Sequence, residues 1–415
     1  MDQNQLELLR FNTSPTFCMA KFHEATIWLY SGQIASCHHT PLSHTGDDLI
    51  TFYNNDYKRQ AQDSMLKGLK PEDCNYCWNL EKQGLQSDRE FKSLHFKDHL
   101  SFEKYLDRNY NFKPKSLELS FQKTCNLACS YCSPSFSTEW VNDFKKHGNY
   151  IEITSDLKNT YVRGLDEEIP VRMDLFWHWF DTIKENLESL RITGGEPLLH
   201  EETFEIFDKM AKVNPNIEFV INTNLCQKPL IIERFINSIN RFQKFRINVS
   251  NESGGHVAEF IRDGMIYKEW LHALEKVVRY TKADVNVSTT LSALSLIGLD
   301  KMLLDIFELR KRNHIIQKFY VSFNVLTYPS FQSFNMLSKE QRQFYHNKYN
   351  IFYLNFKEDF VELEKITFPR ILNSLSLEKL DSNYLLLQKD AESFFKQYTI
   401  RRNKQENLYF RLGLE

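Results

Sequence analysis

The chain has 415 residues, which is more than one ordinary domain needs and predicts two or three units, each large enough for its own core. Hydrophobic residues make up 42% and aromatic residues 14% of the chain, a composition that excludes a disordered protein. Lysine and arginine total 52 against 54 aspartate and glutamate, so the formal net charge of -2 offers no general attraction to nucleic acid or to an anionic membrane.

The sequence contains no apolar run of about 18 residues that would span a bilayer. Its first residues, MDQNQLELLRFN, lack the basic and then apolar regions of a secretion signal. We therefore expect a soluble, cytoplasmic protein with no membrane partner and no nucleic-acid partner.

The first eighty residues hold four of the eight cysteines, at Cys18, Cys37, Cys74 and Cys77. Thiols stay reduced in the cytosol, so metal or redox chemistry is a better expectation than disulfides. Strand-like runs on either side of Ser31-Gly32 predict a β-hairpin between the first two cysteines. Four thiolates close a zinc site or an iron-sulfur cluster equally well, and the residues alone leave both open. The neighbouring His38 and His39 are expected at the surface.

Three more cysteines lie within eight residues of one loop, at Cys125, Cys129 and Cys132. The loop follows residues 116–121, whose alternating apolar side chains predict a strand. Three thiolates can wrap one metal centre and leave one coordination position open, as catalytic metal sites do. The alternative is a zinc loop that takes a fourth ligand from a distant cysteine or histidine.

A second predicted strand, residues 189–193, runs directly into Gly194-Gly195-Glu196-Pro197. Glycines have no Cβ, so the backbone at this turn can approach a ligand closely. The tetrapeptide alone is a weak signal, but its place at a strand end, one βα unit after the cysteine loop, makes it informative.

These two features together resemble the radical S-adenosylmethionine (SAM) enzymes. The spacing C-x3-C-x2-C, with Tyr131 before the last cysteine, is similar to the signature of that family, and the glycine-rich turn is similar to its GGEP turn. The resemblance implies a 4Fe-4S cluster on Cys125, Cys129 and Cys132, whose open iron binds SAM. It also implies that one electron cleaves SAM to a 5'-deoxyadenosyl radical, which abstracts hydrogen from a substrate.

Residues 116 to 326 alternate short β-like runs with amphipathic helical runs, which is typical of parallel βαβ units. The predicted strands are 116–121, 189–193, 217–222, 245–250, 284–290 and 318–325. Helical spacing predicts helices at 174–187, with Asp174 as N-cap, and at 204–210 and 231–239. With the family resemblance, this pattern predicts an α/β fold with a partial (β/α)6 TIM-like barrel. Its active groups should lie at the carboxyl ends of the strands.

The resemblance also implies which residues bind the cofactor. Ser250 is expected near the SAM ribose, Asn224 in the same pocket and Tyr131 against adenine. Arg262 is expected on the SAM carboxylate, because a guanidinium donates two parallel hydrogen bonds to such a group. The full expected cofactor-binding set is Tyr131, Gly194, Gly195, Glu196, Asn224, Ser250 and Arg262. Strand-end turns and surface charges are the alternatives.

The first 95 residues resemble the auxiliary-cluster twitch module of this family, which usually follows the barrel and here precedes it. The element C-x13-G-x4-C carries this resemblance, together with the segment from Cys77 to Arg89, which looks like C-x3-E-x2-G-x2-S-x-R. The resemblance implies a second, auxiliary 4Fe-4S cluster on Cys18, Cys37, Cys74 and Cys77. Tetrahedral zinc remains the alternative.

After residue 326 the pattern predicts a loop over the barrel mouth and then helices. Residues 338–397 are expected to use apolar faces for core packing, with Phe344, Tyr345, Ile351, Phe352, Leu354 and Phe356 on those faces. The run Arg401-Arg402-Asn403-Lys404 predicts a solvated face. Cys226 is expected to be a buried thiol, with a radical-relay or acid-base role as the alternative.

We therefore expect an auxiliary-cluster module at 1–95, a radical SAM barrel at 112–330 and a capping loop with C-terminal helices at 331–415. The expected activity is hydrogen abstraction from a peptide or protein side chain, since many relatives with an auxiliary cluster mature peptides. The alternatives are oxidation or rearrangement of a small metabolite, such as an aminosugar or amino acid, and a non-catalytic iron-sulfur or zinc protein. A flavodoxin or ferredoxin is expected to supply electrons.

Overall fold

The computed structural model describes residues 15–37, 43–44, 56–82, 84, 86–95, 113–155, 171–313 and 318–412. The chain divides into two compact units. Unit 1 comprises the described residues within 1–122, 168–192 and 209–219, and unit 2 those within 123–167, 193–208 and 220–415. The domain bounds expected from the sequence stay predictions.

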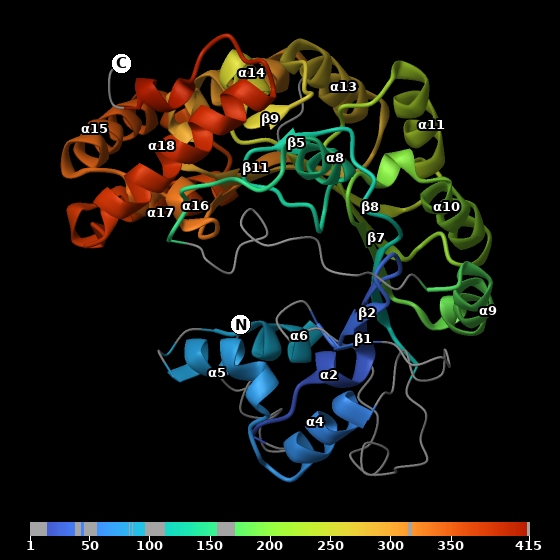
Figure 1. The fold of residues 1–415 in the computed structure, drawn as a ribbon. Coiled ribbons are helices and arrows are strands. Elements are labelled where there is room, and N and C mark those ends of the chain that lie inside the picture. The colour runs from blue at the N-terminus through green and yellow to red at the C-terminus, as the bar shows by residue number, and fades with distance from the viewer. Residues whose placement is uncertain are drawn as a thin grey trace. The chain divides into compact units, whose positions relative to one another are not determined.

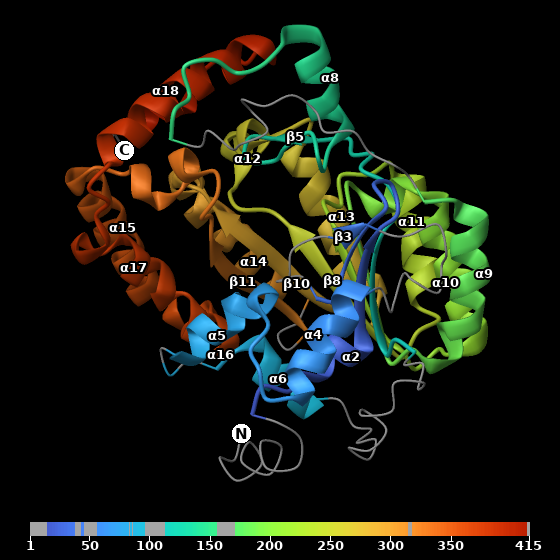
Figure 2. The same ribbon diagram turned by 60° about the horizontal axis from the view of Figure 1, so that its bottom comes forward.

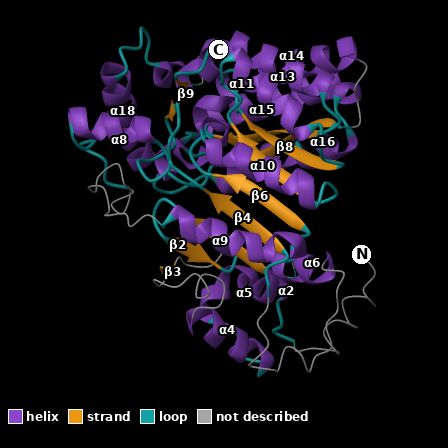
Figure 3. Cartoon of the chain, turned by 90° about the vertical axis from the view of Figure 1, so that its right-hand side faces the viewer, coloured by secondary structure: helices purple, strands orange, loops and turns teal. Residues whose placement is uncertain are grey.

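Unit 1 is built around a small sheet. Strand β1 (Glu24–Trp28) pairs antiparallel with β2 (Gln33–Ala35) and parallel with β4 (Ser116–Ser120), and β6 (Ser189–Thr193) lies on the other side of β4. Figure 3 shows these strands as neighbouring orange arrows. The hairpin predicted between the first two cysteines is confirmed. The remaining elements of the unit are α2 (Met19–His23), β3 (Ser43–His44), α4 (Asp56–Leu66), η1 (Glu72–Cys74), α5 (Asn75–Lys82), α6 (Asp88–His95), α9 (Met173–Ile183) and η2 (Lys184–Asn186).

Unit 2 has a parallel sheet in which β10 (Asp284–Leu291) pairs with β8 (Lys244–Ser250) on one side and β11 (Phe319–Val325) on the other. Alternate residues of these strands, such as Ile247 and Val287, are fully buried. Helices α11 (Pro229–Ile239) and α13 (Tyr267–Tyr280) contact each other beside the sheet (Figure 1). The boundary between the units falls within β7 (Glu218–Thr223) and α10 (Glu201–Val213). Other elements of unit 2 are β5 (Ala128–Cys129), α8 (Thr138–His147), η3 (Pro197–Leu199), α12 (Gly255–Ile261), β9 (Arg262–Asp263), η4 (Ala293–Ile297) and α14 (Leu299–Asn313).

All six predicted strands are present, each with ends within one residue of the expected ones. The chain therefore has an α/β fold with mostly parallel strands. One local detail differs: α9 begins at Met173 with Arg172 as its N-cap, so Asp174 lies inside the first turn. The N-terminal auxiliary module and the partial (β/α)6 barrel stay predictions.

The predicted helical C-terminal region is present, with α15 and α17 packed together in unit 2 (Figure 2). Tyr345 and Phe352 are buried as expected, but Ile351 and Leu354 are exposed because they lie on the opposite side of α15. Among the described residues, no helix is both long and apolar enough to cross a lipid bilayer. The elements of this region are η5 (Ser330–Gln332), η6 (Phe334–Met336), α15 (Lys339–Phe356), η7 (Lys357–Asp359), α16 (Glu362–Thr367), α17 (Pro369–Leu375), η8 (Leu377–Lys379), α18 (Tyr384–Arg401) and η9 (Leu408–Arg411).

Candidate active site at the cysteine loop

The three-cysteine loop begins unit 2 and is held by a short antiparallel pairing. Its strand β5 pairs with β9, with Cys129 opposite Arg262, and the Ser130 N–H donates to the Ile261 carbonyl at 2.7 Å. Cys129 is buried, whereas Cys125 and Cys132 are half-buried. The loop thus brings its three thiols to the end of α12, far from them in sequence.

The three thiols of the loop interact electrostatically. Burial, and then the charge of Cys129, raises the pKa of Cys125 to about 12, and burial raises the pKa of Cys132 further. The positive charge of a bound metal centre would offset this repulsion and stabilise the cysteines as thiolates. Within the described ranges, no three His, Cys, Asp or Glu side chains are drawn together closely enough to enclose a metal ion. The fit of an iron-sulfur cluster therefore rests on the donor chemistry and on the shared loop.

The glycine-rich turn lies against the backbone that leads into this loop. A Cβ on Gly195 would lie 2.5 Å from the Lys123 carbonyl oxygen and closer still to that of Thr124, so only glycine fits here. The Glu196 N–H donates to the same Thr124 carbonyl at 2.8 Å. Gly194 has a φ of 123°, which also favours glycine. We expected these glycines to let a ligand approach the backbone. In the structure, Gly195 also packs against the backbone of Lys123 and Thr124.

Glu196 is fully buried and bound by the end of β7. One carboxylate oxygen accepts from the Thr223 hydroxyl at 2.7 Å and from the Leu198 N–H at 3.0 Å, and the other from the Asn224 N–H at 2.6 Å. Burial raises the pKa of Glu196 to about 7, although these three donors oppose the shift. Both oxygens of Glu196 are therefore engaged by protein groups.

Asn224 connects the end of β7 to the cysteine loop. Its side-chain amide donates to Asn126 Oδ1 at 3.0 Å and lies 3.8 Å from Cys125 Sγ, and its oxygen accepts from the Cys226 N–H at 2.8 Å. Leu225 between them has a φ of 57° and is fully buried, an uncommon conformation for leucine. The half-buried Cys226 has a raised pKa through burial, and the charges of Cys125 and Cys129 act on it as well.

The predicted ligand Arg262 is tied to an acid that the sequence argument did not single out. Its guanidinium contacts Glu252 through Nε at 2.8 Å and Nη2 at 2.5 Å, and Nη2 also donates to the Tyr131 hydroxyl at 2.8 Å. Its Nη1 lies 3.6 Å from Cys129 Sγ. Burial opposes the charge on Arg262, but Glu252 raises its pKa well above the ordinary value. A sequence signal for Glu252 was available, because it stands two residues after the end of β8, at the carboxyl end of a strand.

Ser250 lies half-buried at the end of β8, in a row of polar side chains that alternates with the buried row of the sheet. In this row Asn286 donates to Asn248 at 3.0 Å, and Asn248 donates to Asn222 at 2.9 Å. The buried Oδ1 of Asn286 has no hydrogen-bond partner among the described residues. Towards the carboxyl ends of the strands the row is uncharged, with members Ser250, Ser288, Thr290, Ser322 and Asn324.

The four N-terminal cysteines of unit 1 come from four different elements. Cys18 caps α2, Cys37 follows β2, Cys74 ends η1 and Cys77 lies in α5. Burial, and then the charge of Cys37, raises the pKa of Cys18 to about 12, and burial raises the pKa of Cys74, with both other thiols adding to it. Burial also raises the pKa of Cys77, and the charge of Cys37 adds to the shift, so Cys37 interacts electrostatically with each of the other three thiols. His38 and His39 lie outside the described residues.

Buried cations surround this quartet. Lys21 is 2% exposed, and its Nζ lies 2.6 Å from Asp73 and 2.8 Å from the Ser36 hydroxyl. Burial lowers the pKa of Lys21, but Cys74 and Asp73 outweigh it and raise the pKa above its ordinary value. Lys58, also buried, donates to the Glu24 carbonyl.

The segment that resembles C-x3-E-x2-G-x2-S-x-R folds back on itself. Arg89 forms a two-pronged ion pair with Glu81, through Nε and Nη2 at 2.8 Å each, and the Ser87 hydroxyl donates to the same carboxylate at 2.6 Å. Arg89 also donates to the Phe17 carbonyl, next to Cys18. The acid, serine and arginine of the motif thus form one network that holds the chain before Cys18.

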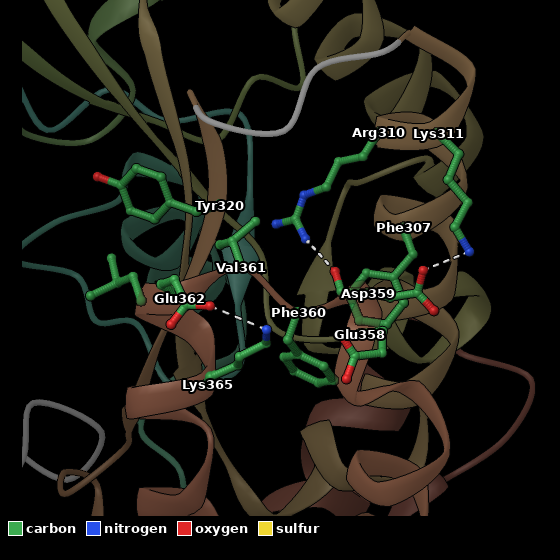
Figure 4. Close-up of a pocket in the computed structure, with 11 residues that line it drawn as sticks. Phe307, Arg310, Lys311, Tyr320, Glu358, Asp359, Phe360, Val361, Glu362 and Lys365 are labelled. Carbon is green, nitrogen blue, oxygen red and sulfur yellow. Dashed lines mark hydrogen bonds and ion pairs between the residues drawn. The ribbon is translucent and has the colours of Figure 1, made fainter.

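A pocket of ≈ 800 Å³ lies elsewhere in unit 2, between α14 and α16 (Figure 4). The cations that line it are paired: Arg310 contacts the buried Glu364, Lys311 pairs with Asp359, and Lys365 pairs with Glu362. Because these cations are neutralised by the protein, the pocket offers little to a charged ligand.

Comparison with known proteins adds to this geometry. A family model described as Radical SAM superfamily matches residues 119–295. The chain is 23% identical over 194 residues to the GTP 3',8-cyclase of Sulfurovum sp. (strain NBC37-1), covering 46% of this chain and 50% of that protein. It is 27% identical over 151 residues to the GTP 3',8-cyclase of Campylobacter jejuni subsp. doylei, covering 36% and 37%. The chain thus matches half or less of the length of these two relatives.

Among solved structures, Streptococcus suis SuiB bound to precursor peptide SuiA aligns with a TM-score of 0.40 and 12% identity, covering 83% of this chain and 73% of that one. SuiB bound to S-adenosylmethionine aligns with a TM-score of 0.39 and 13% identity, covering 80% and 69%. The family match spans the cysteine loop, the glycine-rich turn and the Arg262 hairpin. Residues 119–295 are therefore similar to the Radical SAM superfamily in sequence.

Proposed function

We propose that unit 2 is the catalytic part of a radical SAM enzyme, with Cys125, Cys129 and Cys132 as the ligands of a 4Fe-4S cluster. When bound, the cluster supplies the electron that cleaves SAM to a 5'-deoxyadenosyl radical, which abstracts hydrogen from the substrate. The protein's part is to hold the thiols, bind SAM beside them and exclude water.

One observation carries this proposal: three thiols in one loop meet the glycine-rich turn on one side and the β9 arginine on the other. Gly195 packs on the backbone before Cys125, and Arg262 lies 3.6 Å from the Cys129 sulfur. Arg262 pairs with Glu252 and contacts the Tyr131 hydroxyl, so this network would orient the loop, with Arg262 Nη1 facing the Cys129 sulfur.

The SAM-cleavage assay tests this proposal. Under dithionite and without oxygen, the wild-type protein should form 5'-deoxyadenosine from SAM, and the triple variant Cys125→Ala, Cys129→Ala, Cys132→Ala should form none. The matched control is Cys226→Ala, which removes a fourth thiol nearby and should keep the iron content. Equal 5'-deoxyadenosine formation by the triple variant and the wild type would refute the assignment.

We also propose a second 4Fe-4S cluster in unit 1, on Cys18, Cys37, Cys74 and Cys77, with zinc as the alternative. The electrostatic coupling of these thiols supports a common metal centre. The buried charge of Lys21 would offset part of the negative charge that four thiolates bring into the protein interior. Such a cluster would pass electrons, and a flavodoxin or ferredoxin would be their source.

Metal analysis separates the two alternatives. Anaerobic reconstitution should give about eight iron atoms per chain with two 4Fe-4S clusters, and about four iron and one zinc if the quartet binds zinc. Replacing the quartet by serine should remove about four iron atoms and leave 5'-deoxyadenosine formation in uncoupled assays measurable. An unchanged iron and zinc content in that variant would exclude a metal at the quartet.

For the substrate, we propose a peptide or protein side chain. The curated relatives are named for GTP, but phosphate recognition uses arginine, lysine or exposed backbone N–H groups. Towards the carboxyl ends of β8, β10 and β11, the polar row carries uncharged amides and hydroxyls. Such groups form hydrogen bonds with peptide N–H and C=O groups. A small neutral metabolite is the second candidate, because the same groups bind sugar hydroxyls.

The choice is tested by asking what stimulates SAM cleavage. A short precursor peptide encoded beside the gene should raise 5'-deoxyadenosine formation and change mass, whereas GTP should do neither. A GTP-derived product would replace the peptide proposal with a cyclase activity. If wild-type protein with intact clusters fails to cleave SAM at all, the remaining candidate is a non-catalytic iron-sulfur protein.

A further inference from the structure

The C-terminal helix α18 reaches the cysteine loop through Tyr398. This side chain is fully buried, and its hydroxyl lies 3.0 Å from the Ala128 carbonyl oxygen and 3.2 Å from that of Phe260. Ala128 directly precedes Cys129, and Phe260 stands two residues before Arg262. One hydroxyl therefore contacts the backbone at the first residue of β5 and in the last turn of α12, just before β9.

Arg402 also acts on the cysteine loop, through Trp140. Its guanidinium stacks over Tyr398 at 4.2 Å and over Trp140 at 4.5 Å. The indole N–H of Trp140 donates to the Cys129 carbonyl at 2.9 Å. Trp140 is fully buried. Arg402 therefore stabilises the position of the Trp140 ring, and the Trp140 indole N–H in turn binds the Cys129 carbonyl.

The basic run 401–404 is not the solvated face that its composition predicts. Arg401 and Arg402 both pair with Asp143, at 3.0 and 3.1 Å, and Lys404 pairs with Asp263 at 2.5 Å. Asp263 belongs to β9 and directly follows Arg262. The charges of the run are thus used against α8 and β9, the two elements that flank the cysteine loop.

We infer that Tyr398 and Arg402 are positioning residues for the three-cysteine loop. They act through the Ala128 and Cys129 carbonyls and touch no ligand themselves. The inference rests on the proposed function of the loop, because a loop with no cofactor to align would need no such support. Groups that orient metal ligands commonly change metal affinity or activity by about 10-fold to 100-fold when they are removed.

The test compares two buried tyrosines in oxygen-free, cluster-loaded protein. Tyr398→Phe removes the hydroxyl beside Cys129, and the matched control Tyr349→Phe removes an equally buried hydroxyl that donates to the Leu296 carbonyl, away from the loop. The first readout is the SAM concentration that half-saturates the change in the cluster's electron paramagnetic resonance signal. The second is amide hydrogen exchange of residues 126–132 in metal-free protein.

We expect Tyr398→Phe to raise the half-saturating SAM concentration about tenfold and to speed exchange in 126–132 by a similar factor, with no change in either for Tyr349→Phe. Equal behaviour of the two variants would overturn the inference. If even the wild-type signal ignores SAM, the proposed function fails, while the exchange data still decide whether Tyr398 holds the loop.

A second pair of variants guards against misfolding. Arg402→Gln and Arg401→Gln each remove one contact to Asp143, but only Arg402 touches Trp140. Arg402→Gln should repeat the SAM effect and Arg401→Gln should not. If Arg401→Gln loses the SAM response to the same degree, residues 401–404 contribute only to the stability of the fold, and the positioning role of Arg402 is contradicted.

Discussion

The two cysteine groups are assembled in opposite ways. In unit 2 the three thiols come from one short loop, and other parts of the unit, the glycine-rich turn, β9 and α18, close on it through backbone contacts. In unit 1 the four cysteines come from four places in the chain, and their thiols interact electrostatically near the buried Lys21 and its acid, Asp73. The loop cysteines are therefore neighbours in sequence and are held by contacts from distant segments. The quartet cysteines are distant in sequence and become neighbours only when unit 1 folds.

The two groups also differ in charge. Beside the loop, the Arg262 fork is neutralised by Glu252, so the site gains little net positive charge. At the quartet, Lys21 and Lys58 are both buried, and the Lys21 ammonium lies beside the Asp73 carboxylate. The quartet thus lies near two buried lysines, whereas the loop lies near one buried arginine.

The largest expected effect is at the Arg262–Glu252 pair, which is almost fully buried. Glu252→Gln leaves the guanidinium with no counter-charge, and we expect the free energy of unfolding to fall by about 4 kcal/mol. Urea denaturation measures this change. The control, Glu201→Gln, breaks the exposed pair with Arg234 and should cost no more than about 0.5 kcal/mol. Similar losses in both variants would contradict the assigned burial.

The matching change in unit 1 is Asp73→Asn, which removes the carboxylate 2.6 Å from the buried Lys21 ammonium. We expect a loss of about 3 kcal/mol, because an uncompensated buried charge remains. The double variant Asp73→Asn, Lys21→Met should recover part of that loss, since no charge is then left unpaired. A double variant less stable than the single one would show that Lys21 is needed for more than its pair.

Glu196 gives unit 2 a pH-dependent stability. Its pKa in the folded protein is about 7, above the ordinary 4.5, so the folded state binds more protons than the unfolded state between these values. The free energy of unfolding should therefore fall as pH rises from about 4.5 through 7, by about 3 kcal/mol at most. Glu196→Gln should lose this part of the slope in urea denaturation at pH 5.5 and pH 8. An identical slope in wild type and variant would contradict the raised pKa.

The smallest expected effect is steric. Gly195→Ala places a methyl group against the Lys123 and Thr124 carbonyls and should cost about 2 kcal/mol while lowering iron retention by the loop. Gly84→Ala is the control, because nothing lies within 4 Å of its Cβ position and only the positive φ of 72° opposes it. Full iron retention in Gly195→Ala would show that the turn and the loop move independently.

Local pattern explains which features could be predicted. The strand predicted at 284–290 follows from β-like residues between helical runs, and the cysteine loop from spacing within eight residues, because both depend on neighbours along the chain. The role of Tyr398 could not be predicted, since its partners Ala128 and Phe260 lie more than a hundred residues away, and the contact of Glu252 with Tyr131 also spans more than a hundred residues. The exposure of Ile351 and the pairing of Arg402 depend in the same way on how helices dock.

The most direct test of the catalytic assignment is electron paramagnetic resonance of the reduced, oxygen-free protein during titration with SAM, using the quartet-to-serine variant so that only the loop cluster contributes. The account predicts a signal from one 4Fe-4S cluster whose g values change on saturation with SAM, because the fourth iron has no protein thiolate. A cluster signal that stays unchanged at saturating SAM would mean that the open iron does not exist, and the proposed chemistry would be wrong.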